Sequence, residues 1–401
     1  MRLKVAIRNV FRNKRRTALN VFMIAGGVSA LIVFSGFVRS IIYGFRDVTI
    51  KTQTGHLQVA TPAYWNKTAK SPKEALMPDY AAVQKKILKQ PGVKSASGRI
   101  TFFGLLSKTD HSTSAQGMSF DPSVESLNKS FKFTAGRGFE KAGAFEVAVG
   151  SGLAANLGIK VGDSVTVLAN TYDGVVNALD LNVAGIFSTA VSSIDDRTFL
   201  VPLQLAQKLL DTQKVEQIVV SLKDTETTDE ILDSLQSTLG PNLEVRSWYS
   251  VAKLFRQVEE FNRVQNEVLK FIILSLILLG ILNTIGMSVF ERTGEIGTVA
   301  ALGETGSSIL KQFVLEGAIL GLLGALAGVA LGAALTEGIN ALELSLVMPG
   351  ASQPLTIVLG YYFRSFFDAA ALSVIAGTLA AIFPAMRASR MNIATALRHN
   401  L

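Results

Sequence analysis

The chain has 401 residues, of which 49% are hydrophobic and only 17% are charged, and its mean hydropathy is +0.35. Soluble proteins usually carry roughly 25% charged residues, so this composition argues against an ordinary soluble enzyme and favours an integral membrane protein with a soluble part. The sequence contains no cysteine, which excludes a disulfide framework and a thiolate metal site.

The formal net charge of +8 is concentrated in part at the N-terminus. Seven cations occur there with no acid among them: Arg2, Lys4, Arg8, Arg12, Lys14, Arg15 and Arg16. Residues 1–16 are predicted to form a basic amphipathic helix at the inner membrane surface, the alternative being a disordered basic tail. The basic charge is therefore assigned to anionic lipids, and no nucleic-acid partner is expected. The three histidines lack metal-ligand spacing, so no metal site is expected.

Four apolar runs are each long enough to form a transmembrane helix: residues 17–45, 265–290, 307–336 and 365–386. The first run exceeds the about 7–15 residues of a signal-peptide core, so we expect an uncleaved signal anchor. We expect Pro384 to end the last helix. Basic residues flank the outer ends of the first and last runs, which places both termini in the cytoplasm, including a tail over residues 387–401. Two segments then lie outside the cytoplasm, residues 46–264 and 337–364, and residues 291–306 lie inside it.

The large outside segment is predicted to be an α+β domain with an inserted β-rich subdomain of about 90 residues. The flanking parts contain a helix over residues 79–90 and another over Thr228–Leu239. A single strand is expected over residues 94–107, and a loop over residues 64–78. The fold class is thus a four-helix membrane protein that carries a large extracytoplasmic α+β domain.

One long helix is predicted over residues 250–290, with a heptad-like stripe that continues into the second apolar run. The stripe consists of Val251, Leu254, Val258, Phe261, Gln265 and Val268, of which Gln265 is the polar member. The pattern favours a rigid stalk that packs on another helix. The alternative is an amphipathic helix that packs against its own domain.

Glycines recur every three or four residues along the third apolar run, a pattern that allows close helix packing in lipid. They are Gly317, Gly321, Gly324, Gly328 and Gly332. Glu316 lies inside the same run and is a functional candidate, because ionisable residues are costly within a membrane. The alternative is that Glu316 lies near the interface or pairs with Lys311.

The polar segment over residues 291–306 is predicted to hold a short helix over residues 292–302, which Gly303 ends. Ser307 or Ser308 is expected to cap the next helix. Glu291 and Glu295 should repel each other unless a cation lies between them. The exposed face is expected to be small and mixed: Gly294, Gly297, Thr298, Ala300 and Ala301. Such a face suits docking to a soluble protein, and an ordinary surface loop is the alternative.

Three stretches carry a resemblance to a known family. They are ERTGEIGTVAALGETGSSILKQFVLEGAILGLLGALAGVALG, the N-terminal IRNVFRNKRRTALNVFMIAGGVSALIV and the C-terminal FPAMRASRMNIATALRH. Together with the order of spans, they resemble the FtsX/MacB-type (type VII) ABC transporter permeases. The segment GHLQVATPAYW and the large outside domain are more similar to the lipoprotein-releasing (LolC/LolE-like) and MacB-like members than to cell-division FtsX proteins.

The resemblance implies a dimer of identical or homologous permeases in a bacterial inner membrane, served by two copies of a cytoplasmic ABC ATPase. It also implies stalks that carry motion to the periplasmic domains, and a periplasmic carrier, adaptor or lipoprotein as a further partner. It places the ATPase contact on a coupling helix: Glu291, Arg292, Glu295, Ile296, Gly297, Ala301, Leu302 and Gly303.

The sequence has no GxxxxGK[ST] motif, so we expect ATP and Mg²⁺ to bind the partner ATPase and this chain to need no cofactor. The expected function is coupling of ATP hydrolysis to lipoprotein release or to export of a periplasmic substrate. A membrane-anchored binding or sensory module that regulates a cell-envelope enzyme is the alternative. A hydrolase is disfavoured, because GxSxG and HExxH motifs are absent and Asp195-Asp196 reads as a loop pair. No catalytic residue is expected.

Overall fold

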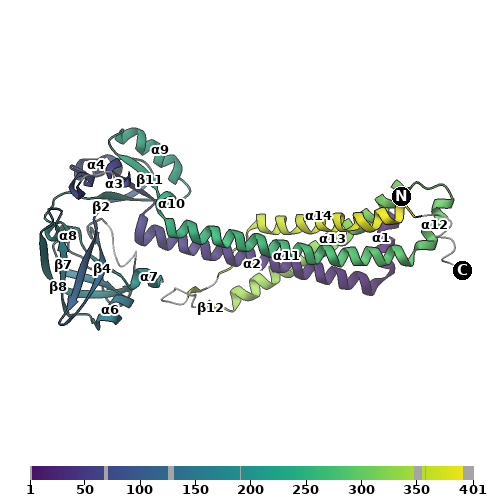
Figure 1. The fold of residues 1–401 in the computed structure, drawn as a ribbon, viewed down its shortest axis with the longest axis horizontal. Helices are drawn as coiled ribbons and strands as arrows, with labels where there is room; N and C mark the ends of the chain where they lie inside the picture. The colour runs from purple at the N-terminus through teal and green to yellow at the C-terminus, as the bar shows by residue number, and fades with distance from the viewer. Residues whose placement is uncertain are drawn as a thin grey trace. The chain divides into compact units, whose positions relative to one another are not determined.

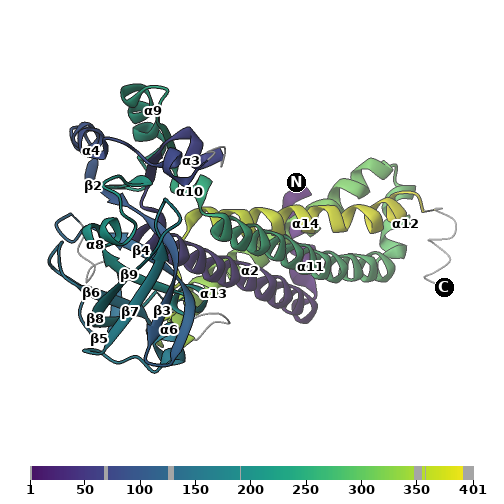
Figure 2. The same ribbon diagram turned by 60° about the vertical axis from the view of Figure 1, so that its left-hand side comes forward.

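The computed structural model describes residues 2–66, 71–124, 131–189, 191–346, 355–356 and 358–391. They fall into two compact units, shown as ribbons in Figures 1 and 2. The helical unit comprises Met1–Tyr43, Val258–Leu344 and Thr356–Leu401. The α+β unit comprises Gly44–Gln257 and Ser345–Leu355.

The helical unit is built from six helices. They are α1 (Arg2–Arg12), α2 (Lys14–Thr49), α11 (Lys253–Glu291), α12 (Thr293–Ala301), α13 (Gly306–Ala341) and α14 (Phe363–Ser389). Four of these, with 36, 39, 36 and 27 residues, are long and apolar enough to cross a membrane: α2, α11, α13 and α14. The predicted set of four apolar helices is confirmed. A π-helical turn (Ile50–Thr54) continues α2, and two short strands, β12 (Ser345–Leu346) and β13 (Leu355–Thr356), occur between α13 and α14.

The apolar helices extend beyond the predicted apolar runs, and the expected break at Pro384 is absent. Pro384 lies inside α14 and is buried. Ala385 and Ala388, which follow Pro384 in the helix, are buried in the apolar cluster that joins the long helices. This packing offsets the loss of the backbone hydrogen bond that proline cannot donate. Of the predicted tail, residues 387–389 belong to α14, whereas residues 392–401 lie outside the described residues.

Four antiparallel strands from the two ends of the α+β unit form one sheet. Their order is β11 (Glu244–Ser247), β1 (Leu57–Ala60), β10 (Gln217–Leu222) and β2 (Val93–Arg99). The register pairs Val59 with Ile218, and both side chains are buried. Helices α4 (Tyr80–Leu88) and α9 (Thr228–Leu239) pack on β2 and β11, and the Asp79 carboxylate accepts a hydrogen bond from the Ala82 N–H at the start of α4.

Strands β3 to β9 form a second, seven-stranded sheet in the order β5, β8, β6, β9, β4, β3, β7, while β12 and β13 pair with each other. Strand β7 also pairs with β8, so six strands close into a barrel and β5 lies outside it on β8. Their bounds are β3 (Thr101–Lys108), β4 (His111–Phe120), β5 (Lys132–Gly136), β6 (Glu146–Gly150), β7 (Ser164–Asn170), β8 (Val176–Ser188) and β9 (Thr198–Pro202). Short helices α6 (Ser151–Leu157), α7 (Ser192–Asp195) and α8 (Leu203–Leu209) accompany them. The predicted α+β domain with an inserted β-rich subdomain is confirmed.

Three local predictions for this unit were wrong. The single strand expected over residues 94–107 is divided at Ile100, whose N–H bonds to the Ser119 hydroxyl at 2.8 Å, so β2 and β3 belong to different sheets. The segment expected to be a loop contains α3 (Pro62–Asn66) and a 3₁₀ turn (Pro72–Ala75), and its residues 67–70 lie outside the described part. The long helix expected from residue 250 begins at Lys253, because Ala252 has a non-helical ψ of 72° and separates it from α10 (Trp248–Val251).

Candidate functional site

The candidate site is α12 with the helix ends around it. The carbonyl of Arg292 accepts the Ile296 N–H at 2.9 Å and so begins the helix. Gly303 follows the last turn with φ of +95°, a conformation that favours glycine, in agreement with its expected role as the stop. The expected cap at Ser307 or Ser308 was wrong, since α13 begins at Gly306 with Thr305 before it.

The exposed face of α12 differs from the prediction. Gly294 and Gly297 are buried, together with Ile296, whose side chain belongs to the same apolar cluster as Val10 and Phe313. Small residues here allow α12 to pack closely within its own chain, instead of leaving a small surface for a partner. The exposed residues are Glu295, Thr298, Val299, Ala301 and Leu302, with Leu302 83% exposed.

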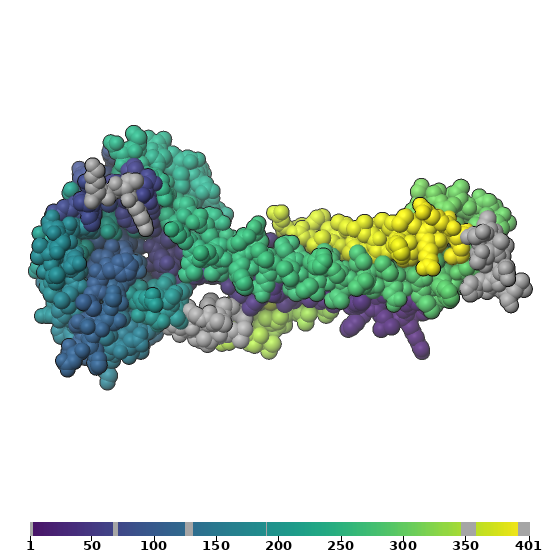
Figure 3. All heavy atoms as spheres, viewed as in Figure 1, coloured from purple at the N-terminus to yellow at the C-terminus, as the bar shows by residue number. Residues whose placement is uncertain are grey.

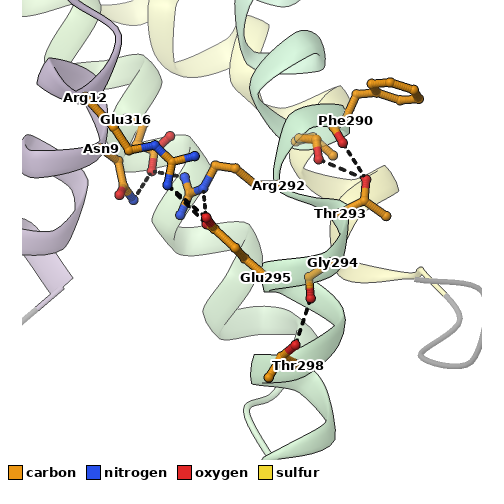
Figure 4. Close-up of polar contacts among 10 residues, drawn as sticks. Asn9, Arg12, Phe290, Arg292, Thr293, Gly294, Glu295, Thr298 and Glu316 are labelled. Atoms are coloured by element: carbon orange, nitrogen blue, oxygen red, sulfur yellow. Dashed lines mark hydrogen bonds and ion pairs between the residues drawn. The ribbon is translucent and has the colours of Figure 1, made fainter. Parts of the chain in front are cut away.

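An ion-pair network holds α12 to its neighbours (Figure 4). The Arg292 guanidinium donates from Nε to Glu295 Oε2 at 3.0 Å and from Nη1 to Glu316 Oε1 at 3.2 Å. From α1, the Asn9 amide donates to the same Glu316 oxygen at 2.7 Å, and Arg12 donates to Glu295 Oε1 at 2.9 Å. The network therefore joins α1, the start of α12 and the first part of α13.

Glu316 is 3% exposed and is the most buried member of this network. Its partners are Arg292 and Asn9, so the expected pairing with Lys311 was wrong. The Arg292 guanidinium also lies 5.6 Å from the centre of the Phe313 ring, one helical turn before Glu316 on α13. A buried carboxylate is stabilised when it has both a cation and a further hydrogen-bond donor, and both are present.

Cations separate the two acids whose repulsion the sequence indicated. Arg16 pairs with Glu291, while Arg12 and Arg292 pair with Glu295. The hydrogen bond from Arg292, with the charge of Arg12, lowers the pKa of the Glu295 carboxyl below its usual range. Both carboxylates are therefore compensated within this chain.

The glycines of α13 divide between two neighbouring helices. A Cβ atom at Gly317 would lie 2.5 Å from the Gly377 carbonyl of α14, and one at Gly321 would lie 2.9 Å from the Ser373 carbonyl. Cβ atoms added at Gly324, Gly328 and Gly332 would lie 2.3–3.0 Å from the α2 side chains of Ile24, Val28 and Ile32, respectively. The stripe thus brings α13 close to both α14 and α2.

The stalk residues are not all on one helix. Val251 ends α10, whereas the other five belong to α11. Within this chain, Leu254, Phe261 and Val268 are exposed, Phe261 by 69%, and Gln265 is exposed beside them. Val258 is partly buried. Among the described residues, three apolar members of the stripe are thus exposed, as a helix that packs on another chain would require.

Sequence reasoning did not assign the N-terminal residues that complete the network, Asn9 and Arg12 of α1 and Arg16 of α2. They are spaced at three and four residues, as on one side of a helix, although α1 ends at Arg12 and α2 begins at Lys14. That spacing was the available signal. Their partners, however, lie 307, 283 and 275 residues away, at Glu316, Glu295 and Glu291 respectively. The assembled site offers a rigid, charged platform.

Two families match the chain. Residues 17–238 match the MacB-like periplasmic core domain, and residues 268–393 match the FtsX-like permease C-terminal domain. The first match covers most of α2 and residues 44–238 of the α+β unit, and the second covers most of α11 together with α12, α13 and α14.

Individual relatives and one solved structure are also similar to the chain. The lipoprotein-releasing system transmembrane protein LolC of Neisseria meningitidis is 27% identical over 96% of this chain and 94% of that protein. An uncharacterized ABC transporter permease of Methanocaldococcus jannaschii is 27% identical over 66% of this chain, which spans 64% of that permease's length. The periplasmic region of MacB from Actinobacillus actinomycetemcomitans covers 52% of this chain and 95% of that structure, with 13% identity and a TM-score of 0.36.

Proposed function

Since the chain belongs to the FtsX/MacB-type family of ABC transporter permeases, we propose that α12 is the coupling helix by which it docks on a separate cytoplasmic ABC ATPase. In this proposal ATP and Mg²⁺ bind the ATPase, and the chain itself holds no cofactor. Movement of the ATPase pair pushes on α12 and passes through the long helices to the α+β unit.

The observation that carries the proposal is the attachment of α12 to two other helices. Arg292 and Glu295 connect it to α13 and α1, so a displacement of α12 also displaces its neighbours. A loosely held loop would absorb the displacement instead. The exposed Val299 and Leu302 at the end of α12 supply an apolar tip for the ATPase to contact.

The membrane arrangement follows from the same proposal. The cations of α1 and α14 favour cytoplasmic ends, and in this proposal the α+β unit is periplasmic and the chain crosses a bacterial inner membrane. The uncovered stripe of α11 packs on a second permease, identical or homologous. A relative named for lipoprotein release and others named for macrolide export support a cargo handled on the periplasmic side, either a lipoprotein or another exported substrate.

The test is a substitution at the apolar tip. Leu302→Asp should reduce co-purification with the ATPase and its stimulation by at least about tenfold, because a carboxylate replaces the most exposed apolar contact. Leu342→Asp, at a leucine 68% exposed beyond the far end of α13, is the matched control. Unchanged binding and turnover in Leu302→Asp would refute the docking role.

A further inference from the structure

An apolar cleft of about 720 Å³ lies in the helical unit, between the last turns of α11 and of α14. Figure 3 shows α14 in yellow lying along α11 in green. Leu282, Gly286 and Phe290 form the α11 side, spaced four residues apart along about 12 Å of helix. Phe383 lies opposite on α14. About 12 Å is the length of part of an acyl chain.

Gly286 keeps this cleft open. A Cβ atom built there would meet no atom within 4 Å, whereas at Gly317 and Gly324 the same test gives contacts of 2.5 Å or less. The glycine at this position therefore does not serve close packing within the described part of the chain. Phe290 and Phe383 are 62% and 63% exposed, so the cleft has apolar sides that open to the surroundings of the helices.

Two cations close the end of the cleft. Arg387 lies on the last turn of α14 and Arg390 directly follows the helix, three residues later; both line the cleft and both are exposed. Among the described residues neither has a carboxylate within ion-pair distance, whereas Arg12, Arg16 and Arg292 at the same end of the unit all have one. Two adjacent guanidinium groups are suited to the oxygens of a phosphate.

We propose that this cleft binds one anionic phospholipid. Its acyl chain lies along Leu282, Gly286 and Phe290, and its phosphate lies at Arg387 and Arg390. A basic pocket between apolar helices is the arrangement expected for such a headgroup. Thr293, the first residue of α12, also lines the cleft, so the bound lipid contacts the start of the proposed coupling helix. Binding of the lipid to this cleft does not require the ATPase, so it can be tested on the permease chain alone.

The probe is phosphatidylglycerol, with phosphatidylcholine as the zwitterionic comparison, titrated into the detergent-purified full chain and counted by native mass spectrometry. We expect one phosphatidylglycerol to bind with about tenfold preference over phosphatidylcholine. Arg387→Gln combined with Arg390→Gln should abolish this preference. Gly286→Leu should weaken the binding of both lipids to a similar extent, because the leucine side chain fills the cleft.

Matched controls separate the site from general membrane affinity. Arg364→Gln removes a cation whose side chain is 84% exposed near the opposite end of α14, and Gly338→Leu adds a side chain where nothing lies within 4 Å. Both should bind phosphatidylglycerol as the parent chain does. Retention of the preference in the double arginine variant would overturn the proposal. So would displacement of the lipid by inorganic phosphate alone, or a change of oligomeric state in Gly286→Leu, which would assign the cleft to a second copy.

Discussion

Glu316 of the helical unit and Glu216 of the α+β unit are both acids withdrawn from solvent, and they have different partners. Glu316 accepts from the Arg292 guanidinium and from the Asn9 amide. Glu216 accepts from neutral donors, the Thr101 N–H at 2.8 Å and the Tyr172 hydroxyl at 3.2 Å. The first arrangement compensates the charge with a cation, whereas the second supplies hydrogen bonds but no cation.

The consequence for Glu216 is a protonation equilibrium near neutral pH. Burial raises the pKa of its carboxyl to about 7, although the two hydrogen bonds act in the opposite direction. The residue lies where the chain returns from the barrel to the four-stranded sheet, and Thr101 begins the first barrel strand. A titratable acid therefore links the two sheets, while a network of ion pairs and hydrogen bonds links three helices in the other unit.

The largest effect should follow from breaking the ion pair on one side only. Arg292→Met leaves the Glu316 carboxylate buried without a cation and should lower the free energy of unfolding by about 3–5 kcal/mol. Arg292→Met combined with Glu316→Met should recover most of that loss, because no charge is then stranded. Denaturation of the full chain in detergent measures both variants.

The control for this pair is Arg364→Met, which removes an arginine from an exposed pair with Asp368 at 3.9 Å. It should change the free energy of unfolding by less than about 0.5 kcal/mol. Equal losses in Arg292→Met and Arg364→Met would show that the buried pair has no special weight.

The second effect concerns pH and the α+β unit. Because the folded pKa of Glu216 lies above the unfolded value of 4.5, the unfolded chain releases this proton first, and stability falls as pH rises from about 4.5 to about 7. The loss should reach up to about 3 kcal/mol and then level off. Glu216→Gln should remove this slope.

Tryptophan fluorescence isolates that measurement, because both tryptophans of the chain, Trp65 and Trp248, belong to the α+β unit. Denaturant unfolding of the full chain between pH 5 and pH 8 should show the slope in the parent chain and in Glu226→Gln, whose side chain is 81% exposed in the parent. A slope that persists in Glu216→Gln would assign the pH dependence to another group.

Local sequence pattern was sufficient for the parts that depend on chain order. Apolar length identified the four long helices, and the order of strands and helices indicated an inserted β-rich subdomain, whose strands the structure shows between residues 101 and 202. Pattern could not show that β7 pairs with β8 to close the barrel, because pairing depends on how distant strands meet in space.

The site was harder to predict for a related reason. The small residues of α12 were assigned to an exposed face, although burial of Gly294 and Gly297 depends on which helices surround them. The partner of Glu316 lay in a different helix from the nearby Lys311. Helical period gives the faces of a helix, but the choice of which face is buried belongs to tertiary packing.

A smaller effect tests whether helix packing also holds Glu316 in place. Gly317→Ala puts a Cβ atom 2.5 Å from the Gly377 carbonyl and should cost about 1–3 kcal/mol, because α13 and α14 must separate. Gly338→Ala, with open space around it, should stabilise α13 by up to about 1 kcal/mol through helix propensity. Thermal denaturation of the two variants compares them directly. Equal stabilisation of both would mean that α13 and α14 are not in close contact at Gly317.

The smallest effect belongs to the exposed end of the network. Arg12 and Glu295 are 52% and 55% exposed, so a double-mutant cycle of Arg12→Gln with Glu295→Gln should give a coupling of about 0.2–1 kcal/mol. That coupling should fall between about 0.05 M and about 0.5 M salt, since salt screens exposed charges, whereas the Arg292–Glu316 coupling should change little. If both couplings fell alike, Glu316 would be as accessible to salt as Glu295, and the distinction between a buried charge pair and a surface one would fail within this unit.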